Sequence, residues 1–486
     1  MSLRIYNTLT GQKEIFKPIK DGEVGMYVCG VTVYDLCHIG HARATVVFDV
    51  IYRYLKYLGY KVKYIRNFTD VDDKIINKAI NEGTGSHEVA ERYIKEFYND
   101  IYPLGIERPT CEPKATDHIQ EMIDMIRILI DKGYAYKAGG NVFYSVGRFE
   151  DYGKLSGKKI DELLAGARIE VDEHKRDPLD FALWKESKPG EPAWESPWGM
   201  GRPGWHIECS AMSHKYLGNT FDIHGGGRDL IFPHHENEIA QSEGVTGERY
   251  VNYWIHNGFV DINKEKMSKS LGNFFTVREV LDRYHPEVLR LFLISSHYRS
   301  PIDFSDHNLK EAKKVLDRFY DILWFAKTAN RGSASMKEVL HEENDDLMKR
   351  FEDAMNDDFN TALVIGYLND LLRDMNRLKD RMPNSTSGKK REILIDINKG
   401  VGVVKRVGDV IGLFCVDPEE YIKGQRLERI KELGIEEVEI NRLIEERNNA
   451  RQRKDWDAAD NTRSYLEKKG IVLEDTQEGT SWRIKD

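Results

Sequence analysis

Residues 24–35 read VGMYVCGVTVYD, residues 41–59 read HARATVVFDVIYRYLKYLG, and residues 60–70 read YKVKYIRNFTD. The first and third stretches are short apolar runs that favour buried strands. In the middle stretch the apolar residues recur at helical spacing, and Gly59 stands where a C-terminal glycine cap belongs. A strand, a helix and a strand in this order predict an α/β fold with a Rossmann-type parallel sheet.

An insertion is expected to interrupt this sheet. From about residue 119 to residue 200, a helical stretch is followed by a predicted hairpin over residues 141–153 and by a run rich in Pro, Trp and Gly. Short apolar runs with turn residues resume over residues 204–260, where the sheet should continue. We therefore predict one split nucleotide-binding domain over residues 1–306.

The remainder of the chain is predicted to be mainly helical. After residue 306 helical spacing dominates, which indicates a helical bundle over residues 307–415. A final unit over residues 425–486 shows two helical segments followed by IVLEDTQEGTSWRI, residues 471–484, which predicts a small hairpin. This last unit is expected to be a mixed α/β domain.

Composition limits the class of protein. The chain has 486 residues, of which 31% are charged, and no apolar stretch is long enough to span a bilayer. The first residues lack the pattern of a secretory signal, and five scattered cysteines favour reduced thiols over disulfides, so a cytoplasmic protein is expected. Because the formal net charge is −9, any polyanionic partner must meet a local basic surface.

A first short motif suits phosphate binding. His38-Ile39-Gly40-His41 lies between the first predicted strand and the first predicted helix, where backbone N–H groups and the positive helix end favour anions. Gly40 would admit a nucleotide close to the backbone, and His38 and His41 offer hydrogen-bond donors. By itself the pattern is equally consistent with a polar helix start.

A second motif, KMSKS at residues 266–270, follows a predicted strand. Nucleotidyl transfer gains from positive charge near the phosphate oxygens, although a short basic run is more often plain surface. Together HIGH and KMSKS resemble the paired signatures of class I aminoacyl-tRNA synthetases. The resemblance implies that an amino-acid carboxylate attacks ATP, bound with Mg²⁺, while Lys266 and Lys269 stabilise the departing pyrophosphate. The KMSKS loop would belong to a stem-contact region over residues 261–306.

Longer segments resemble one family of that class. VCGVTVYDLCHIGHAR, NFTDVDDKI, GWHIECSAMS and FDIHGGGRDLIFPHHENEIAQSE are similar to cysteinyl-tRNA synthetases, and the likeness extends to the carboxyl terminus. It implies that Cys29, Cys209, His234 and Glu238 hold one zinc ion. Only His234 and Glu238 have the spacing of one helix face. Val31 departs from the family, which usually has proline in this turn.

A zinc ion would explain how cysteine is chosen over serine. The two amino acids differ by one atom, and an apolar pocket separates such near-isosteres by only about 1–3 kcal/mol. Zinc binds thiolate at about 2.3 Å and has little comparable affinity for a neutral hydroxyl. Serine would therefore be rejected at binding, and the insertion would need no editing function.

Further site residues follow from the same resemblance. Thr69 and Trp205 are expected to line the amino-acid pocket, with Trp205 as an apolar wall. Asp229 is expected to accept a hydrogen bond from the ATP ribose, and Gly40, His41 and Lys269 to complete the ATP site. The likeness also gathers four histidines about the metal, to which no single roles are assigned: His206, His224, His235 and His256.

The final unit is expected to bind the tRNA anticodon. Arg451 and Trp456 combine a basic stretch with an aromatic side chain, as single-stranded RNA requires, although nearby acids alone would favour a solvated helix. The resemblance implies that Arg451, Trp456, Asp460 and Asp475 contact the anticodon bases.

The resulting prediction is a monomeric ligase that activates L-cysteine with ATP and transfers it to the 3′-terminal adenosine of tRNA(Cys). One alternative, a ligase that joins cysteine to an amino sugar, would share the active site but lack a unit like residues 425–486. A zinc hydrolase, suggested by the HHENE run, would have no use for KMSKS. A non-catalytic RNA-binding relative would be expected to have lost part of HIGH, KMSKS or the ligand set, and all are intact.

Overall fold

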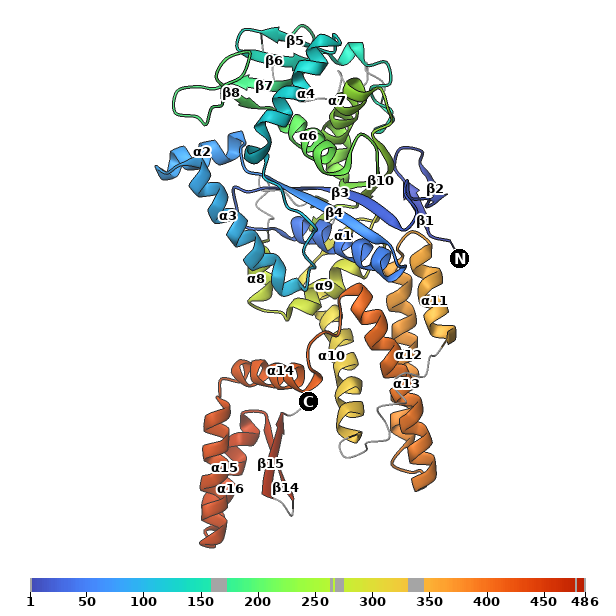
Figure 1. Cartoon of the computed structure of the whole chain (residues 1–486). Helices are drawn as coiled ribbons and strands as arrows, with labels where there is room; N and C mark the ends of the chain where they lie inside the picture. Colours follow the sequence, from blue (N-terminus) through green and yellow to red (C-terminus); the bar gives the residue numbers. More distant parts are fainter. Residues whose placement is uncertain are drawn as a thin grey trace. The chain divides into compact units, whose positions relative to one another are not determined.

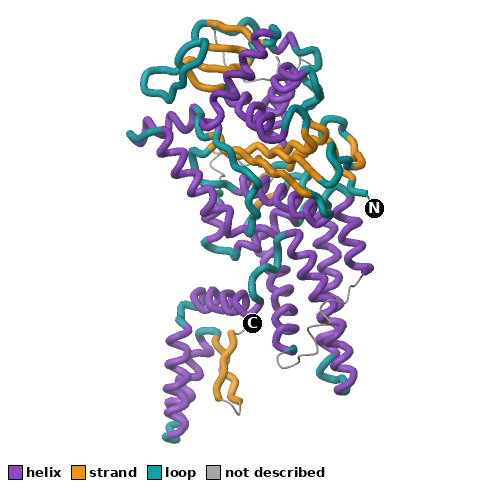
Figure 2. The backbone as a smooth tube through the Cα atoms, viewed as in Figure 1, coloured by secondary structure: helices purple, strands orange, loops and turns teal. Residues whose placement is uncertain are grey.

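A computed structural model describes residues 2–158, 173–262, 265–266, 275–330, 345–476 and 479–484. The chain forms two compact units, which are described separately (Figure 1). The first unit comprises residues 1–316, 343–373 and 403–413, and the second comprises residues 317–342, 374–402 and 414–486. Helices predominate after residue 306, as expected (Figure 2).

A four-stranded parallel sheet forms the centre of the first unit. Its order is β10-β9-β3-β4, and each neighbouring pair is parallel. The strands are β3 (Glu23–Thr32), β4 (Lys61–Thr69), β9 (Phe221–Gly227) and β10 (Val251–Asn257). Because β9 and β10 return to this sheet after the insertion, the predicted Rossmann-type sheet with an interruption is confirmed.

Helix α1 (Ile39–Tyr57) connects β3 to β4. Its apolar face is buried, and the chain leaves it through Gly59 at φ 88°, a left-handed conformation that glycine adopts at low cost. At the other end His38 is the N-cap, and its side chain accepts a hydrogen bond from the backbone N–H of His41. The HIGH motif therefore lies between strand and helix, as predicted.

The insertion contains α4 (Ile119–Asp131) and a four-stranded antiparallel sheet. The strands are β5 (Ala135–Ala138), β6 (Asn141–Tyr144), β7 (Phe181–Glu186) and β8 (Gly201–Pro203), in that order. The hairpin predicted over residues 141–153 is wrong, since β6 pairs with the preceding β5 through the tight Gly139-Gly140 turn. Residues 159–172 of the insertion lie outside the described part of the chain.

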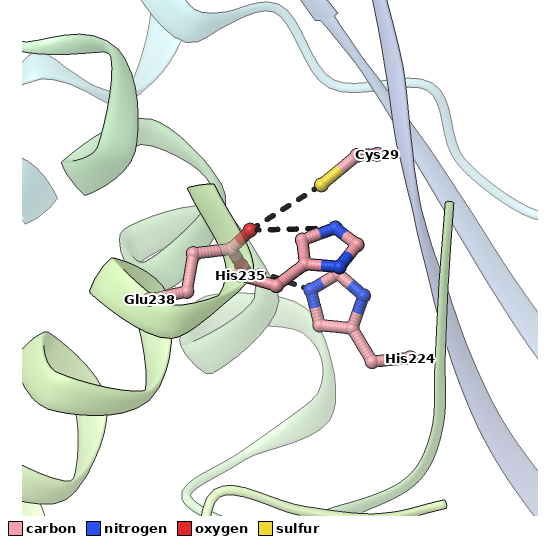
Figure 3. Close-up of side chains that lie close together, drawn as sticks. All are labelled: Cys29, His224, His235 and Glu238. Atoms are coloured by element: carbon pink, nitrogen blue, oxygen red, sulfur yellow. Dashed lines mark hydrogen bonds and ion pairs between the residues drawn. The ribbon is translucent and has the colours of Figure 1, made fainter. Parts of the chain in front are cut away.

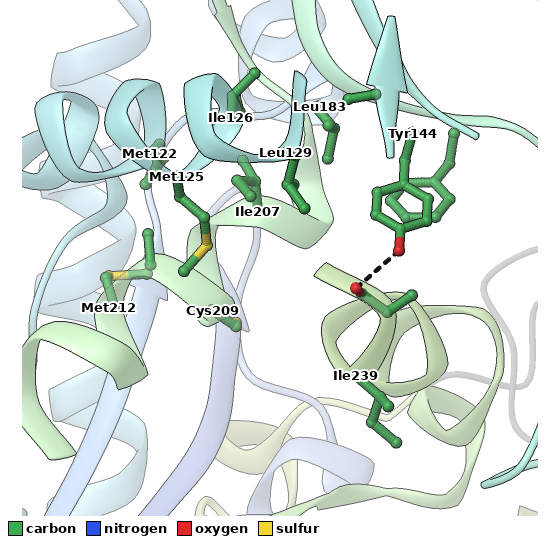
Figure 4. Packing of buried hydrophobic residues seen from close by; sticks show 14 of the residues in the cluster. Met122, Met125, Ile126, Leu129, Tyr144, Leu183, Ile207, Cys209, Met212 and Ile239 are labelled. Carbon is green, nitrogen blue, oxygen red and sulfur yellow. Dashed lines mark hydrogen bonds between the residues drawn. The ribbon is translucent and has the colours of Figure 1, made fainter. Parts of the chain in front are cut away.

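The insertion shares a hydrophobic core with α6 (Trp205–Leu217) and α7 (Glu236–Thr246). Figure 4 shows α4 side chains such as Met125 and Leu129 packed near Ile207 of α6. The Tyr144 hydroxyl donates to the Ala240 carbonyl at 2.8 Å, which connects β6 to α7. The insertion thus braces the two helices that carry Cys209 and Glu238.

A second sheet of the first unit has the order β12-β11-β13. Strand β11 (Val260–Ile262) pairs antiparallel with β12 (Glu265–Lys266) and parallel with β13 (Ile302–Phe304). The other elements are β1 (Arg4–Asn7), β2 (Gln12–Ile15), α2 (Asp73–Glu82), α3 (Ser86–Ile101), α8 (Val277–Leu281), α9 (Pro286–Ile294) and α11 (Asp345–Asn356).

Three long helices contribute residues to both units: α10 (Asp306–Ala329), α12 (Thr361–Arg381) and α13 (Ser387–Ile411). The second unit adds α14 (Pro418–Glu432), α15 (Glu437–Gln452), α16 (Trp456–Lys468), β14 (Ile471–Thr476) and β15 (Gly479–Ile484). The predicted hairpin is confirmed, because β14 and β15 pair antiparallel.

The final unit has one helix more than predicted. Helix α14 runs through residue 425 and starts at Pro418, where the Asp417 side chain caps it. Its Ile430 packs with Ile440, Ile444 and Leu466 of the following helices and with Ile471 of the hairpin. Within the described part of the chain, none of the helices combines the length and the apolar content needed to cross a bilayer.

Candidate functional site

A cavity of about 380 Å³ opens at the carboxyl ends of the central strands. The end of β3 contributes Cys29 and Thr32, and the end of β9 contributes Gly227. Its lining also includes His38, Gly40, His41, Trp205, Asp229, Asn257 and Gly258. Parallel α/β sheets bind their ligands in this position, so the cavity is the candidate active site.

The HIGH histidines form one rim of the cavity. The rings of His38 and His41 stack with their centroids 3.5 Å apart, and the His38 Nδ1 accepts the His41 backbone N–H at 3.2 Å. The backbone N–H of Ile39 donates to the Phe275 carbonyl at 3.2 Å. The start of α1 is therefore hydrogen-bonded to a residue five positions after the end of KMSKS.

Four potential metal ligands predicted from the sequence meet beside the cavity. The Cys29 and Cys209 sulfurs lie 3.5 Å apart, and Cys29 lies 3.4 Å from Glu238 Oε1. The His234 Nε2 lies 3.0 Å from the same Glu238 oxygen. One ligand atom from each residue lies within 4.8 Å of the other three. The chain brings these residues from β3, α6, the helical turn Ile231–His235 and the start of α7.

A second set of four residues meets the same distance criterion. It keeps Cys29 and Glu238 and replaces the other two ligands by His224 and His235. Figure 3 shows these side chains turned toward one another. The His224 Nε2 lies 2.8 Å from Glu238 Oε2, whereas the His235 Nε2 lies 3.9 Å from Glu238 Oε1. Geometry alone thus offers two ligand sets that share a thiol and a carboxylate.

Polar neighbours orient the shared carboxylate and the surrounding imidazoles. The Tyr250 hydroxyl donates to Glu238 Oε2 at 3.1 Å. The His235 Nδ1 lies 2.8 Å from His256 Nε2, and the His256 Nδ1 lies 2.8 Å from the Thr8 hydroxyl. These contacts fix ring orientations, which is the usual task of groups that surround a metal site.

Electrostatics favours ionisation of two ligands of this buried cluster, Glu238 and Cys209, whereas burial raises the pKa of Cys29 well above its usual range. Burial opposes ionisation of Glu238, but His224 and His234 outweigh it and hold the pKa of Glu238 well below its usual range. Burial likewise opposes ionisation of Cys209, yet Cys29 and His234 lower the pKa of Cys209 to about 6. A buried carboxylate beside a thiolate is a donor set that attracts a divalent cation.

The predicted substrate residues lie close to this cluster. The Trp205 ring stacks on the metal-ligand candidate His234 with centroids 4.2 Å apart and is 39% exposed, so its open face belongs to the cavity. Thr69 ends β4 and is buried, and its hydroxyl donates to Glu208 at 2.8 Å. Asp229 is exposed and lines the cavity.

Sequence reasoning missed three polar side chains of the site. Glu208 is fully buried next to Cys209 and holds the Thr69 hydroxyl. The Asn67 Oδ1 accepts the Gly30 backbone N–H at 2.9 Å and lies 3.7 Å from the Cys209 sulfur. Tyr250, the third, touches Glu238. Asn67 and Glu208 stood inside the NFTDVDDKI and GWHIECSAMS segments, whereas no sequence signal marked Tyr250.

The KMSKS lysines are only partly covered by the described residues. Lys266 is the last residue of β12, where its backbone pairs with that of Asp261 in β11. Lys269 lies outside the described residues. Their assigned role in nucleotidyl transfer therefore stays a prediction.

The four anticodon candidates all belong to the second unit. Trp456 begins α16 and is 59% exposed, and Asp460 is also exposed. Asp475 accepts two hydrogen bonds from Arg447, at 2.9 and 2.8 Å, and pairs with Arg451 at 3.0 Å. Their contacts with RNA stay a prediction, but two of the four already share an ion-pair network.

Three family descriptions match the chain in succession. Residues 15–314 match "tRNA synthetases class I (C) catalytic domain", residues 350–415 match "DALR domain", and residues 437–483 match "Cysteinyl-tRNA ligase anticodon binding domain". In chain order, these matches cover the cavity, the helices α12 and α13, and the helices α15 and α16 with the final hairpin.

Curated relatives match the full chain. "Cysteine--tRNA ligase" of Geobacter sulfurreducens is 56% identical over 491 residues, with 100% of both chains covered. The protein of the same name from Thermodesulfovibrio yellowstonii is 55% identical over 492 residues, covering 99% of this chain and 100% of that one. Identity at this level over the full length indicates a shared family and not only a shared fold.

Solved structures share the fold at low identity. Methionyl-tRNA synthetase of Mycobacterium tuberculosis, bound by methionyl-adenylate, superposes with a TM-score of 0.62 at 14% identity, covering 80% of this chain and 92% of that chain. A putative arginyl-tRNA synthetase from Campylobacter jejuni gives a TM-score of 0.58 at 14% identity, with 82% and 94% covered.

Proposed function

Since the chain belongs to the cysteine–tRNA ligase family of class I aminoacyl-tRNA synthetases, we propose that Cys29, Cys209, His234 and Glu238 hold a zinc ion that selects its amino acid. The family's reaction, the ATP-dependent joining of cysteine to tRNA, is the activity of this chain. The proposal concerns how its own residues carry that reaction out.

The donor set fits zinc. Two sulfurs bound tetrahedrally at about 2.3 Å would lie about 3.8 Å apart, and the Cys29 and Cys209 sulfurs are 3.5 Å apart. The Glu238 oxygen lies 3.4 Å from Cys29 and 3.0 Å from His234, distances of the same order. This closeness of two thiols to an imidazole–carboxylate pair is the observation that carries the proposal.

A zinc ion held by the four residues would accept the thiolate of cysteine as a fifth partner, whereas it would bind a neutral serine hydroxyl poorly. The protein side chains do the rest of the selection. Trp205 covers His234 and gives the pocket an apolar wall. The buried Thr69 hydroxyl donates to Glu208 and accepts from the Asn67 side-chain amide at 3.5 Å, and its remaining lone pair would accept from the substrate ammonium group.

Adenylate formation would use the two signatures. The cysteine carboxylate attacks the α-phosphorus of ATP, the bond to the bridging oxygen breaks, and pyrophosphate leaves with Mg²⁺. His38 and His41 donate to phosphate oxygens, Gly40 lets the nucleotide approach α1, and Asp229 accepts a hydrogen bond from the ribose. Lys266 and Lys269 stabilise the charge on the departing pyrophosphate.

The second step would transfer cysteine to RNA. A hydroxyl of the 3′-terminal adenosine of tRNA(Cys) attacks the adenylate carbonyl, and AMP leaves. In the second unit Arg451, Trp456, Asp460 and Asp475 would contact the anticodon, the aromatic ring by stacking and the carboxylates by accepting from base edges. Since ribosomes consume the product, we propose a cytoplasmic enzyme, acting as a monomer.

The two candidate ligand sets can be separated by counting thiolates. The full chain is loaded with Co²⁺, whose sulfur-to-metal charge-transfer absorption grows with the number of bound thiolates. We expect two thiolates in the wild type, one in Cys209→Ser, and two in His235→Gln. A Cys209→Ser spectrum identical to that of the wild type would refute the proposed set in favour of the set with two histidines.

Substrate choice is tested in the same preparations. Cysteine-dependent ATP–pyrophosphate exchange should vanish after chelation and return with zinc, and serine should support little exchange at any zinc level. If the rate of exchange did not change after chelation, the proposed role of zinc would be wrong, but the assignment of the chain's activity would still hold.

A further inference from the structure

Arg43 is a fully buried cation two residues after the HIGH motif. A buried guanidinium is costly unless its N–H groups find acceptors. Its Nη1 donates to the Phe259 carbonyl at 2.7 Å, and its Nη2 donates to the Tyr298 carbonyl at 3.3 Å and to the Ser300 carbonyl. Arg43 thus links helix α1 to two other segments of the chain through backbone atoms alone.

Both segments lead into the second sheet. Phe259 directly precedes β11, and Ser300 lies just before β13. The segments are also bonded to each other, since the Gly258 N–H donates to Tyr298 at 2.8 Å and the Ile302 N–H donates to Phe259 at 3.0 Å. A side chain at Gly258 would come within 2.4 Å of the Ser300 oxygen, so this close approach requires glycine.

The contact joins the two halves of the active site. Helix α1 begins at the HIGH histidines, and β11 is paired with β12, from which the chain continues through KMSKS. Gly258 and Phe259 themselves line the cavity. Burial lowers the pKa of Arg43 to about 10, which leaves the side chain charged at neutral pH.

We propose that Arg43 is a positioning residue for adenylate formation, which holds the strands that lead into KMSKS at a fixed distance from the HIGH helix. The proposal rests on the function proposed above for Lys266 and Lys269. Transfer of a nucleotidyl group depends on placing cations around phosphate oxygens, and a shift of about 1 Å can cost roughly 100-fold in rate. The guanidinium donates to the three carbonyls from two nitrogens fixed in one plane, whereas a lysine has all three N–H donors on one nitrogen, so Arg43→Lys should not keep the same geometry.

A matched control exists in the same unit. Arg290 is also fully buried and also braces α1, through the carboxylate of Asp49. Its other acceptors are the carbonyls of Ile411 at 2.8 Å and Leu104 at 2.9 Å. None of these three acceptors lines the cavity, so Arg290 has the same structural task without the link to the second sheet.

The test compares Arg43→Lys with Arg290→Lys in the full chain. Both variants should lower the melting temperature. We expect Arg43→Lys to lower kcat of ATP–pyrophosphate exchange about 10- to 100-fold, with the KM for cysteine and the zinc content unchanged. Arg290→Lys should keep kcat within about twofold. Equal kinetic behaviour of the two variants would show that Arg43 is merely structural and would overturn the inference.

Two further variants keep the test decisive if Arg43→Lys folds poorly. Gly258→Ala places a methyl group against the Ser300 carbonyl and should push apart the same two segments that Arg43 joins. It should give the same loss of kcat with unchanged zinc content. In a double-mutant cycle, Arg43→Lys should cost little once Lys269→Ala has removed the cation it positions, whereas additive effects would contradict the inference. Unchanged exchange in Lys269→Ala alone would instead refute the role proposed for that lysine.

Discussion

The cluster of candidate metal ligands (Cys29, Cys209, His234 and Glu238) and the final unit hold their polar groups in opposite ways. In the cluster, Cys209, His234 and Glu238 are at most 1% exposed, and each contacts another polar group of the site. In the final unit, Trp456 is 59% exposed and Asp460 is exposed as well. Burial makes an unpaired polar group costly, so the cluster is ordered by the fold itself, whereas the exposed side chains would gain their main contacts from the RNA proposed above.

The largest effect is expected from removing one thiol of the cluster. Cys209→Ser replaces a soft thiolate by a hydroxyl that zinc binds weakly, so cysteine-dependent exchange should fall more than about 100-fold and zinc content should drop. Cys415→Ser, which changes an exposed cysteine outside the site, should leave both unchanged. Full zinc occupancy with normal exchange in Cys209→Ser would show that Cys209 is not a ligand and would favour the set that contains His224 and His235.

A smaller loss of activity is expected from changing Tyr250, which contacts the candidate ligand Glu238. Tyr250→Phe removes only the hydroxyl that donates to Glu238 at 3.1 Å. Loss of such an orienting hydrogen bond typically weakens metal affinity about 10- to 100-fold, so exchange should recover when zinc is added in excess. Tyr253→Phe is the control, since its hydroxyl contacts the Ile15 carbonyl and the Lys17 N–H away from the cluster. A zinc affinity unchanged by Tyr250→Phe would mean that the ligands alone order Glu238.

For the exposed Trp456 of the final unit, we expect a loss of activity that is confined to the reaction with tRNA. Base stacking on an aromatic ring contributes about 1–3 kcal/mol, and the acidic neighbours Asp457 and Asp460 favour the lower end of that range. Trp456→Ala should therefore lower kcat/KM for tRNA roughly 10-fold and leave pyrophosphate exchange unchanged. The equally aromatic but differently placed Trp324, 40% exposed on α10, is the control and should tolerate alanine. A parallel loss of exchange would contradict the assignment of Trp456 to the anticodon.

The parallel sheet and the long helices were predictable because their signals are local. Apolar runs, helical spacing and the glycine after α1 each act within a few residues. The same holds for His234 and Glu238, whose spacing of four residues brought them onto neighbouring helical turns. The hairpin over residues 141–153 failed because the turn chemistry lay upstream, at the paired glycines before β6.

Contacts between distant segments left no such signal. Cys29 and Cys209 are 180 positions apart and meet only because the sheet closes again after the insertion. They were expected from family resemblance rather than from spacing. The contact between Tyr250 and Glu238 was not expected at all, since an isolated tyrosine ahead of a strand carries no mark of a metal site.

The pairing of Asp475 was equally hidden, because Arg447 lies 28 positions away on another element. The sequence offered Asp475 only as a group that accepts from RNA. In the structure its carboxylate accepts from Arg447, Arg451 and Thr480, so any base contact must share these oxygens. Asp475, an exposed residue for which an RNA contact is proposed, can therefore also stabilise the final unit.

The smallest predicted effect follows from that ion pair. Hydrogen bonds from Arg447 hold the pKa of Asp475 well below its usual range, so the pair stabilises the hairpin above the unfolded pKa of about 3.9 and loses this effect as pH falls through the folded pKa. Because Asp475 is 38% exposed, solvent limits the contribution to about 1 kcal/mol. In the full chain at pH 6, hydrogen exchange of the β14–β15 amides should be roughly fivefold faster in Asp475→Asn than in the wild type. The ratio should begin to fall only below about pH 3.9 and approach one as pH reaches the folded pKa, after correction for intrinsic exchange rates. A ratio independent of pH would mean that the ionised Asp475 carboxylate does not stabilise the hairpin. The order of the hairpin would then not depend on the ion pair between Arg447 and Asp475.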